Sequence, residues 1–283
     1  MKRMISALAL AAIVTMPLSV AAQVGRDAET WTWDGRVEAG RWFKLSNVNG
    51  AVIVEPSSDN MVHVRAEKTV RRGSVTDVAF QVVQSGGDVR ICALWRRSVC
   101  DEDGMRSRRG DDNENDRSDV KVRFTVRVPR GVRLDAGTVN GSVSVRELTS
   151  DVNASTVNGA VEVKNVGGQV KASTVNGAVD VTTRTGPVTA NTVNGDIDVR
   201  MESLQSSSEM QFETVNGSVR VETPSSLDAN VSLQTMHGSL VTDYPLTIQG
   251  RFGPRSASGT VGRGGRRIKL TTLNGNVELR KGR

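Results

Sequence analysis

Residues 152–199 decide the fold, and they read VNASTVNGAVEVKNVGGQ (152–169), VKASTVNGAVDVTTRTGP (170–187) and VTANTVNGDIDV (188–199). The tetrapeptide Thr-Val-Asn-Gly returns in each unit, which places Asn158, Asn176 and Asn194 at steps of 18 residues. A short fixed period is typical of stacked architectures, in which each unit buries its apolar face only against its neighbours. Related tetrapeptides continue the pattern on both sides and contain Asn140, Asn216, His237 and Asn274, with an early copy that ends at Gly50.

Each unit consists of two alternating runs rich in Val, Ala and Thr, joined by glycine-containing corners. Asn-Gly between alternating runs is a strong hairpin signal, so an antiparallel β-meander is one alternative. A meander does not require the same residues at every second turn. Stacked coils do, because like side chains then lie about 4.8 Å apart and asparagine amides can bond along the stack. We therefore predict an all-β chain that forms a parallel β-solenoid of ~18-residue coils.

The repeated asparagines are the predicted structural ladder: Asn140, Asn158, Asn176, Asn194, Asn216 and Asn274. Alternation within the runs predicts that Val152, Ala154 and Thr156 and their equivalents face the core, as do Val161 and Val163 and theirs. The parity must change between the two runs, and the corner glycine can absorb that change with a positive φ. Two alternatives stay open. Either the asparagines point inward and an apolar stripe is exposed, or the valines are core and the asparagines decorate the corner; the valines concerned are Val139, Val157, Val175, Val193 and Val215.

The outward positions of the second run form two columns of opposite charge. One column holds Glu162, Asp180, Asp198 and Glu278, and the next holds Arg146, Lys164, Arg200 and Arg280. We expect diagonal pairs such as Glu162 with Lys164 and Asp198 with Arg200, on a solvent-exposed face. The alternative is a Ca²⁺ ion bridging Asp180, Asp196 and Asp198, because hard oxygen ligands in a row suit that cation.

The N-terminus has the features of a secretory signal. Lys2 and Arg3 precede an apolar stretch, and Val20-Ala21-Ala22 forms a small-residue cleavage site. We expect a signal peptide at 1–22 and a mature chain at 23–283 that is exported to the periplasm or cell surface. No later segment approaches 18 consecutive apolar residues, so we expect no transmembrane helix in the mature chain.

The mature chain is predicted to be a single β-solenoid domain. Residues 23–130 should form irregular strands, and 131–283 the regular Thr-Val-Asn-Gly coils. The acidic segment 101–119 has too little apolar surface to order itself, so we expect a mobile insertion there. Cys92 and Cys100 suit a disulfide in an oxidising compartment, with free buried thiols as the alternative.

Basicity is concentrated at the C-terminal end. Residues 251–283 hold nine Arg or Lys against the single acid Glu278, so the rest of the mature chain is net negative. This end could contact lipopolysaccharide or an acidic polysaccharide through Arg263, Arg266, Arg267 and Lys269. The alternative is a solvated cap on the terminal coil. Nucleic acid is disfavoured by export and by the lack of aromatic residues among these cations.

Several motifs together resemble a known family. They are Asn-Val-Asn-Gly-Ala-Val near Gly50, FTVRVPRGVRL (124–134), the Thr-Val-Asn-Gly units, Ser-Gly-Thr-Val-Gly from Ser258, and IKLTTLNG from Ile268. The chain is similar to the bacterial "putative-adhesin" family of repeat proteins, related to head-GIN-like β-helix domains. The resemblance implies a right-handed β-helix-like solenoid at the cell surface or in the envelope, with adhesion as the proposed role. It brings no catalytic residues with it.

Chemistry-bearing residues are sparse. His63 and His237 are the only histidines, and His237 occupies an asparagine position of the repeat. We therefore predict a protein that is not an enzyme and has no catalytic, cofactor-binding or metal residues. The preferred function is an adhesive or ligand-binding β-solenoid, which an exposed valine stripe would favour. The alternative is a scaffold or envelope-stress component that binds envelope proteins. The least favoured reading is a polysaccharide-cleaving β-helix that uses Asp180, Asp196 and Asp198 with Arg200.

Overall fold

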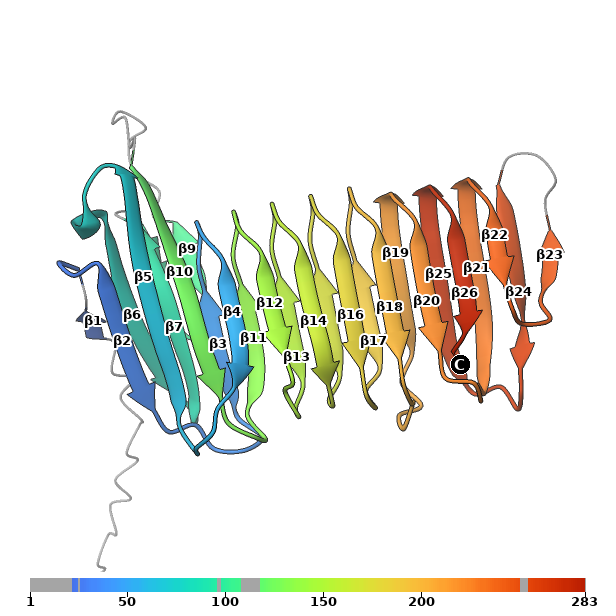
Figure 1. The fold of residues 1–283 in the computed structure, drawn as a ribbon, viewed down its shortest axis with the longest axis horizontal. Coiled ribbons are helices and arrows are strands. Elements are labelled where there is room, and N and C mark those ends of the chain that lie inside the picture. Colours follow the sequence, from blue (N-terminus) through green and yellow to red (C-terminus); the bar gives the residue numbers. More distant parts are fainter. Residues whose placement is uncertain (1–21, 25, 96–97, 108–117, 250–253, 283) are drawn as a thin grey trace, which may run out of the picture.

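Two long β-sheets lie face to face along the whole molecule (Figure 1). The computed structural model describes residues 22–24, 26–95, 98–107, 118–249 and 254–282. Within these ranges the one helical element is the short 3₁₀ helix η1 (Val75–Asp77), capped by Ser74. None of the described segments is a helix able to cross a membrane. Consecutive coils pair in parallel, so the β-solenoid prediction is confirmed and the antiparallel meander is excluded.

Sheet A is the thirteen-stranded sheet. Its order is β1 (Ala22–Val24), β6 (Val78–Ser85), β7 (Asp88–Trp95), β3 (Trp42–Ser46), β11 (Arg133–Gly137), β13 (Val152–Ser155), β15 (Val170–Ser173), β17 (Val188–Asn191), β19 (Met210–Asn216), β25 (Arg266–Asn274), β21 (Ala229–His237), β24 (Arg255–Val261) and β23 (Thr247–Gln249).

Sheet B is the eleven-stranded sheet. Its order is β2 (Thr30–Gly35), β5 (Val62–Arg72), β10 (Asp119–Val128), β4 (Val52–Pro56), β12 (Val143–Arg146), β14 (Val161–Val166), β16 (Val179–Thr183), β18 (Ile197–Met201), β20 (Val219–Thr223), β26 (Val277–Lys281) and β22 (Leu240–Thr242).

Each coil gives one strand to each sheet, and equivalent residues stack in register. Val152 of β13 pairs with Val170 of β15, which pairs with Val188 of β17. On sheet B, Val161, Val179 and Ile197 stack in the same way. A repeat of 18 residues therefore brings like side chains together at the strand spacing of about 4.8 Å.

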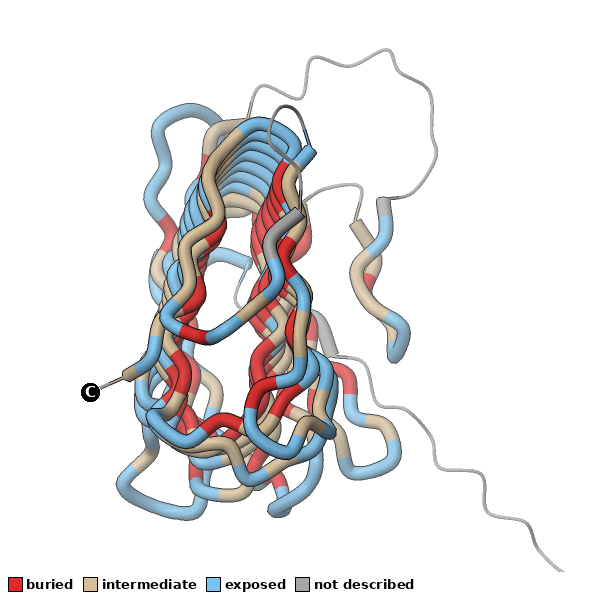
Figure 2. Tube along the Cα trace, turned by 90° about the vertical axis from the view of Figure 1, so that its right-hand side faces the viewer, coloured by how far each residue is buried: buried red, intermediate tan, exposed pale blue. Residues whose placement is uncertain are grey.

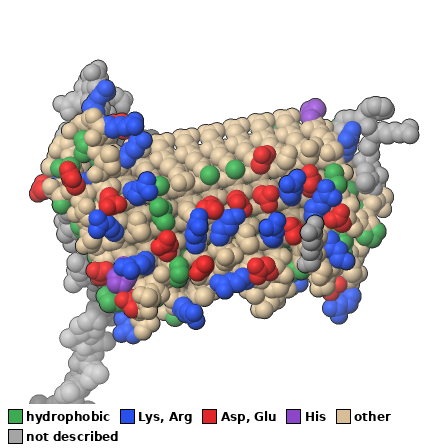
Figure 3. Space-filling view, in the orientation of Figure 1, with side chains coloured by type: hydrophobic (Ala, Val, Ile, Leu, Met, Phe, Trp, Pro, Cys, Tyr) green, Lys and Arg blue, Asp and Glu red, His purple; other side chains and the backbone are tan. Residues whose placement is uncertain are grey.

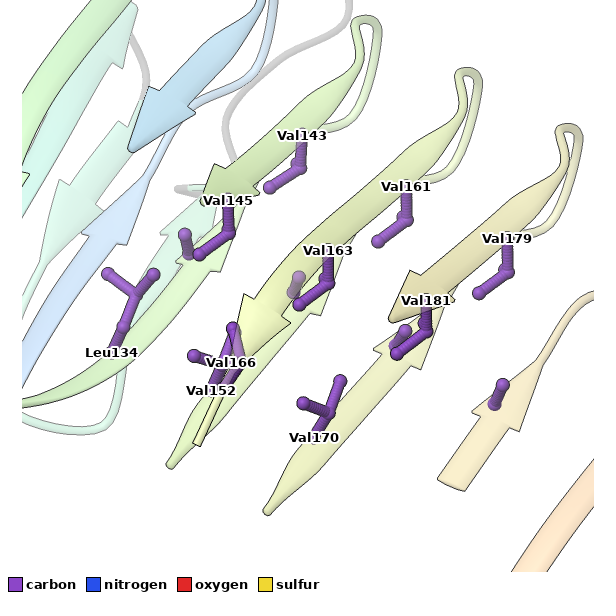
Figure 4. Close-up of a cluster of buried hydrophobic side chains, with 14 of the residues drawn as sticks. Leu134, Val143, Val145, Val152, Val161, Val163, Val166, Val170, Val179 and Val181 are labelled. Atoms are coloured by element: carbon purple, nitrogen blue, oxygen red, sulfur yellow. The ribbon is translucent and has the colours of Figure 1, made fainter. Parts of the chain in front are cut away.

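The core is the single layer of side chains between the sheets. The inward residues predicted from alternation are confirmed: Val152, Val161 and Val163 are fully buried, and Thr156 is 5% exposed. Figure 4 shows the valines of β12, β14 and β16 pointing toward those of the facing strands. The N-terminal part of the core is wider and aromatic, where Trp31 stacks on Phe80 at 4.6 Å between ring centroids.

Both ends of the stack depart from sequence order. The coil of β3 and β4 packs against that of β11 and β12, and most of the intervening chain forms the cap β5, β6, β7 and β10. At the other end, the C-terminal coil of β25 and β26 lies between the coil of β19 and β20 and the coil of β21 and β22. The alternative of a basic cap on the terminal coil is therefore wrong for β25 and β26, which form an interior coil paired on both sides, whereas β24 of the same basic segment does lie at the end of sheet A.

The predicted acidic insertion at 101–119 is partly ordered. β8 (Ser98–Cys100) and β9 (Met105–Ser107) form a small antiparallel sheet. The Asp101 carboxylate accepts hydrogen bonds from the amides of Asp103 and Gly104 and pairs with Arg106, which fixes the turn. Residues 108–117 lie outside the described residues, as does the predicted signal peptide up to residue 21.

Cys92 and Cys100 form a disulfide bond. It ties β7 to β8 on the outer side of sheet A, where the two sulfur-bearing residues pack with Val83 and Leu94. A hydrogen bond from the Gln81 side chain to the Cys100 carbonyl, 3.0 Å long, adds a second link. The β8–β9 hairpin is thus fastened to the solenoid at its base.

Candidate binding edge

The corner that joins sheet A to sheet B has the same hydrogen bonds in every coil. The threonine of Thr-Val-Asn-Gly turns inward, and its hydroxyl donates to the corner glycine carbonyl of the preceding coil in the stack. The Oγ1 to O distances are 2.8 Å for Thr156 to Gly141, 2.9 Å for Thr174 to Gly159, 3.0 Å for Thr192 to Gly177 and 2.9 Å for Thr214 to Gly195. A buried donor and a buried acceptor are satisfied together at each step, so threonine recurs.

The corner glycine is required by the close approach of successive coils. A Cβ added at Gly177 would lie 2.0 Å from the carbonyl oxygen of Gly159, and one at Gly195 would lie 1.9 Å from that of Gly177. We expected a positive φ to be the reason for the glycine. Such an angle occurs at Gly50 (φ 122°), Gly159 (158°), Gly217 (155°) and Gly275 (153°), but Gly177 and Gly195 are not among the residues with positive φ, so the prediction holds for only part of the corners. Steric contact between backbones is the common cause.

Each alternative for the corner is half correct, because the valines form the exposed stripe of the first and the asparagines lie at the surface as in the second. Val157 is 38% exposed and Val175 39%, and the asparagines beside them are also exposed. The inward Thr156 and the inward Val161 are separated by four residues, all of which lie outside the core. The change of parity is therefore spread over the whole corner, which appears as the pale upper arc in Figure 2.

The asparagine side chains form a continuous hydrogen-bonded ladder. Each Nδ2 donates to the Oδ1 of the preceding coil in the stack, at 2.8 Å for Asn158 to Asn140, 2.8 Å for Asn176 to Asn158, 2.9 Å for Asn194 to Asn176, 2.7 Å for Asn216 to Asn194 and 2.8 Å for Asn274 to Asn216. A primary amide has two N–H donors and two acceptor lone pairs. Each inner rung therefore keeps one N–H and one lone pair for a partner in solution.

An apolar stripe lies beside this ladder. It has one residue per coil, in the stacking order Val139, Val157, Val175, Val193, Val215, Leu273 and Met236. The last six are 38–41% exposed. On the sheet A side of the stripe is a column of small polar residues, which includes Ser155, Ser173 and Asn191. We call the stripe, the ladder and this polar column together the asparagine edge. Figure 3 shows this upper edge nearly free of charged side chains.

The polar column was not singled out from the sequence, although a signal for it exists. The outward residue before each buried threonine is Ser155, Ser173 and Asn191 in three successive units. This position is small and polar in these three units, whereas the neighbouring outward position holds Asn153, Lys171 and Thr189.

The charged columns lie on the outer face of sheet B, and their ion pairs join neighbouring coils. Arg146 pairs with Glu162 at 3.1 Å, Lys164 with Asp180 at 2.5 Å, and Arg200 with Glu222 at 2.9 Å. The expected pairs within one strand, Glu162 with Lys164 and Asp198 with Arg200, do not form, although Arg280 pairs with Glu278 within β26 at 3.3 Å. The pairs of Arg146 and Lys164 are diagonal across adjacent strands, whereas Arg200 lies opposite Glu222.

Asp198 has no ion-pair partner within 4 Å among the described residues. Burial and the neighbouring Asp180 carboxylate raise its pKa above the usual value. The structure does not gather Asp180, Asp196 and Asp198 around a common point, because Asp196 instead accepts the Ser218 amide at 2.7 Å. Across the described ranges, no cluster of three or more metal-ligating side chains occurs. The calcium alternative is therefore not supported by this geometry.

The four cations predicted to contact polyanions each have a partner in the protein. Arg263 pairs with Asp228 at 2.9 Å, Arg267 with Glu209 at 3.6 Å and Lys269 with Glu213 at 2.9 Å. Arg266 donates to the Leu204 carbonyl at 3.5 Å. Because the C-terminal coil is interior, acids from adjacent coils lie beside three of these cations and lower their pull on an external anion.

The two histidines lie at opposite edges of the solenoid. His237 takes the asparagine position at the end of the ladder, in register with Asn274. His63 lies at the other edge, where Nδ1 is 2.5 Å from Asp34 Oδ1 and Nε2 is 3.0 Å from Asp59. Asp34 and then Asp59 raise the pKa of His63 above 6.5. The Met61 amide, with His63, lowers the pKa of Asp59 to about 2.

The turns that return the chain from sheet B to sheet A form the return edge. It carries a groove of about 650 Å³ lined by Arg130, Glu147, Asn165, Arg184 and Glu202, among others. Glu147 (φ 56°) and Asn165 (φ 57°) have left-handed backbone conformations there. Acidic and basic groups alternate around this groove, in contrast to the uncharged asparagine edge.

Three solved structures are similar over most of this chain. A "putative adhesin" from Bacteroides fragilis matches with a TM-score of 0.37 and 12% identity, over 89% of this chain and 97% of that one. A "putative adhesin" from Parabacteroides merdae has a TM-score of 0.33 and 9% identity, over 91% and 98%. A "putative cell adhesion protein" from Clostridium sporogenes has a TM-score of 0.29 and 10% identity, over 89% and 100%.

Among proteins with curated functions, none matches this chain. The family model described as Toastrack DUF4097 matches residues 114–280, which include every strand from β11 to β25 and nearly all of the Asn-Gly coils. This protein belongs to the Toastrack DUF4097 family.

Proposed function

We propose that this protein is a non-enzymatic, exported module of the cell envelope that binds its ligand along the asparagine edge. One observation carries the proposal: a valine, leucine or methionine side chain, 38–41% exposed, recurs in each of six successive coils, beside an asparagine of the ladder in five of them and beside His237 in the last. Apolar groups that recur in a row on a surface are typical of interaction sites, whereas single exposed ones are ordinary.

The chemistry of the edge suits binding better than catalysis. Methyl groups and carboxamides make contacts and hydrogen bonds, but neither exchanges protons near neutral pH. The edge is also held rigid, since backbone pairing, threonine hydroxyls and the ladder all fix it. A preorganised surface loses little conformational entropy when a ligand binds, so contacts that are weak one by one can add up along its length.

The test is a sedimentation assay with bacterial envelope fragments. The variant Val157→Ser, Val175→Ser and Val193→Ser removes the centre of the stripe. We expect its apparent affinity for the fragments to fall about tenfold, a difference of about 1.4 kcal/mol. The matched control replaces Asn153, Lys171 and Thr189 with Ser in the same coils, at the middle of sheet A, and should bind as the unaltered protein does. Unchanged binding of the valine variant would refute the proposal.

A further inference from the structure

We infer that the ligand of the asparagine edge is an uncharged linear glycan, whose chain lies along the stripe and whose end enters a pocket beside Met236 and Leu273. This inference rests on the proposed function, because it names the ligand of the same surface. Three properties support it: the pattern of chemical groups across the edge, the exclusion of other ligand classes, and the pocket at the end of the stripe.

Across the edge, polar and apolar groups alternate as they do on a sugar chain. Serine hydroxyls at Ser155 and Ser173 flank the valines on one side, and the free N–H and lone pair of each asparagine flank them on the other. A sugar ring presents C–H groups on its faces and hydroxyls around its rim. A glycan laid over the valines therefore meets methyl groups beneath and hydrogen-bonding partners on both sides, and the contacts repeat with each coil.

Charge excludes polyanions and polycations as the preferred ligand. Among the residues of the stripe, the ladder and the polar column, the one carboxylate is Glu213, and Lys269 neutralises it at 2.9 Å. Asp196 stands beside the ladder, but its Oδ1 accepts the Ser218 amide. Along the stripe, therefore, no net charge attracts a charged polymer, and the one cation of the proposed site is Arg255 in the pocket at its end.

An extended peptide or a membrane fits less well. A peptide that adds as a β-strand needs free backbone groups, but the corner amides are bonded between coils, as Asn176 to Val157 at 2.8 Å and Gly177 to Asn194 at 2.9 Å. A membrane-binding surface buries a broad apolar face. Here the apolar stripe is one side chain wide and is bordered by amides, so inserting it would bury those amides in hydrocarbon as well.

The stripe ends in a pocket of about 340 Å³ between β21, β24 and β25. Met236 and Leu273 line it and continue the stripe, and Gln234 and Thr271 continue the polar column. The Thr271 hydroxyl oxygen is buried with no hydrogen-bond partner among the described residues. Arg255 also lines the pocket. It donates to the Gly238 carbonyl at 2.9 Å through Nη1, which leaves other guanidinium donors.

This pocket lies where the stack of coils stops. β24 runs antiparallel to β21, and no described strand of sheet B continues beyond β22. A chain that follows the valines from Val157 therefore reaches larger apolar side chains, an unsatisfied hydroxyl and a guanidinium at the last coil. These groups suit the terminal unit of a neutral glycan, which has one more hydroxyl than an internal unit.

Isothermal titration calorimetry of the full chain tests the inference. The probes are neutral oligosaccharides of increasing length from glucan, mannan and galactan, with oligogalacturonates as the charged comparison. We expect at least one neutral series to bind, with an affinity that rises with length and falls about tenfold in the triple valine variant. Tighter binding of oligogalacturonates, or no binding of any neutral series, would overturn the inference.

The pocket has its own matched pair of variants. Thr271→Val removes the unsatisfied hydroxyl but keeps the shape, so it should not lower the melting temperature; we expect affinity to fall several-fold. Thr271→Ser keeps the hydroxyl and should retain affinity. If Thr271→Val and Thr271→Ser bind the glycan with equal affinity, the Thr271 hydroxyl does not contact it and the pocket is not the site of its terminal unit. If the glycans fail while valine-dependent sedimentation with envelope fragments persists, the inference is wrong and the proposed function stands.

Discussion

The asparagine edge and the return edge are built by the same chain, yet only one of them repeats. At the asparagine edge, backbones and side chains of successive coils touch at every step, so Thr, Asn and Gly recur. At the return edge the turn after β18 is longer, and the spacing from Asn194 to Asn216 grows to 22 residues without disturbing the ladder. Both edges have close backbone contacts between coils, at the corner glycines on one side and at Gly168 and Gly186 on the other. The asparagine edge differs because its side chains also bond from coil to coil, whereas the return turns vary in length.

The largest effect should come from a methyl group at the asparagine edge. In Gly177→Ala the new Cβ would meet the Gly159 carbonyl oxygen at 2.0 Å and the Ala160 nitrogen at 3.1 Å, and these backbone atoms cannot move aside as a flexible side chain could. We expect a loss of about 3 kcal/mol in the free energy of unfolding, measured by urea denaturation. The control is Gly167→Ala at the return edge, where the nearest atom, the Thr149 carbonyl oxygen, is 3.3 Å away. Equal losses would show that the distance to the backbone of the neighbouring coil does not set the cost of the methyl group.

The ladder itself should contribute less. Asn176→Ala removes the bonds to Asn158 and Asn194, which are 2.8 and 2.9 Å long but exposed to water. We expect destabilisation of about 1 kcal/mol by urea denaturation. Asn153→Ala, on the outer face of sheet A, has no such bonds to lose. If Asn176→Ala destabilises the protein no more than Asn153→Ala does, the ladder aligns the side chains of the edge without adding to the free energy of unfolding.

At the return edge, replacing Glu147 with glycine should stabilise the protein. Glu147 has a φ of 56°, a conformation that costs a residue with a Cβ about 1 kcal/mol. Glu147→Gly should therefore raise stability slightly, by roughly 0.5 kcal/mol after the added entropy of the unfolded chain. Thermal melting is the measurement, with Glu202→Gly in the same groove as control. A fall in melting temperature for Glu147→Gly would show that the strain is compensated by the side chain.

The smallest expected effect is a dependence of stability on pH, which arises from His63 and Asp59 on the side of the return edge. The raised pKa of His63 gives stability that is present below pH 6.5 and lost as pH rises through the folded value. The lowered pKa of Asp59 gives stability that is present above pH 3.8 and lost as pH falls toward about 2. The difference in melting temperature between the protein and His63→Gln should be greatest between these limits. A difference independent of pH would exclude the ion pair.

The two edges also differ in how far their structure could be predicted from the sequence. Alternation identified the inward Val152 and Val161, and the recurrence of Asn158, Asn176 and Asn194 predicted their stacking. Both follow from local rules applied at a fixed period. The exposure of both Val157 and Asn158 could not be deduced, because alternation of period two assigns neighbours to opposite faces and does not describe a four-residue corner.

The spatial order of the coils at the two ends of the stack could not be predicted from the sequence either. The interval between tetrapeptides gives the length of a coil but not which coil is its neighbour, so the position of β25 between β19 and β21 was missed. The same arrangement bears on the site, since Lys269, predicted as a possible polyanion contact, lies beside Glu213 of the adjacent coil and pairs with it while staying partly exposed. The surroundings of the Thr271 hydroxyl could not be predicted either. They depend on the strand order β25, β21, β24, in which β21 pairs with both of the other strands.

The interior position of the last coil also sets the order of assembly. Synthesis delivers β19, β20, β21 and β22 before β25 and β26, and domains fold as their chain emerges. β21 cannot reach its place until β25 exists, because β25 is the strand that joins it to the rest of sheet A. The coils up to β20 pair with one another without β25 and β26, whereas β21 and β22 join the stack only through those two strands. A chain that stops at Val261 lacks the joining coil, so β21 and β22 would have no partner that links them to the rest of the solenoid.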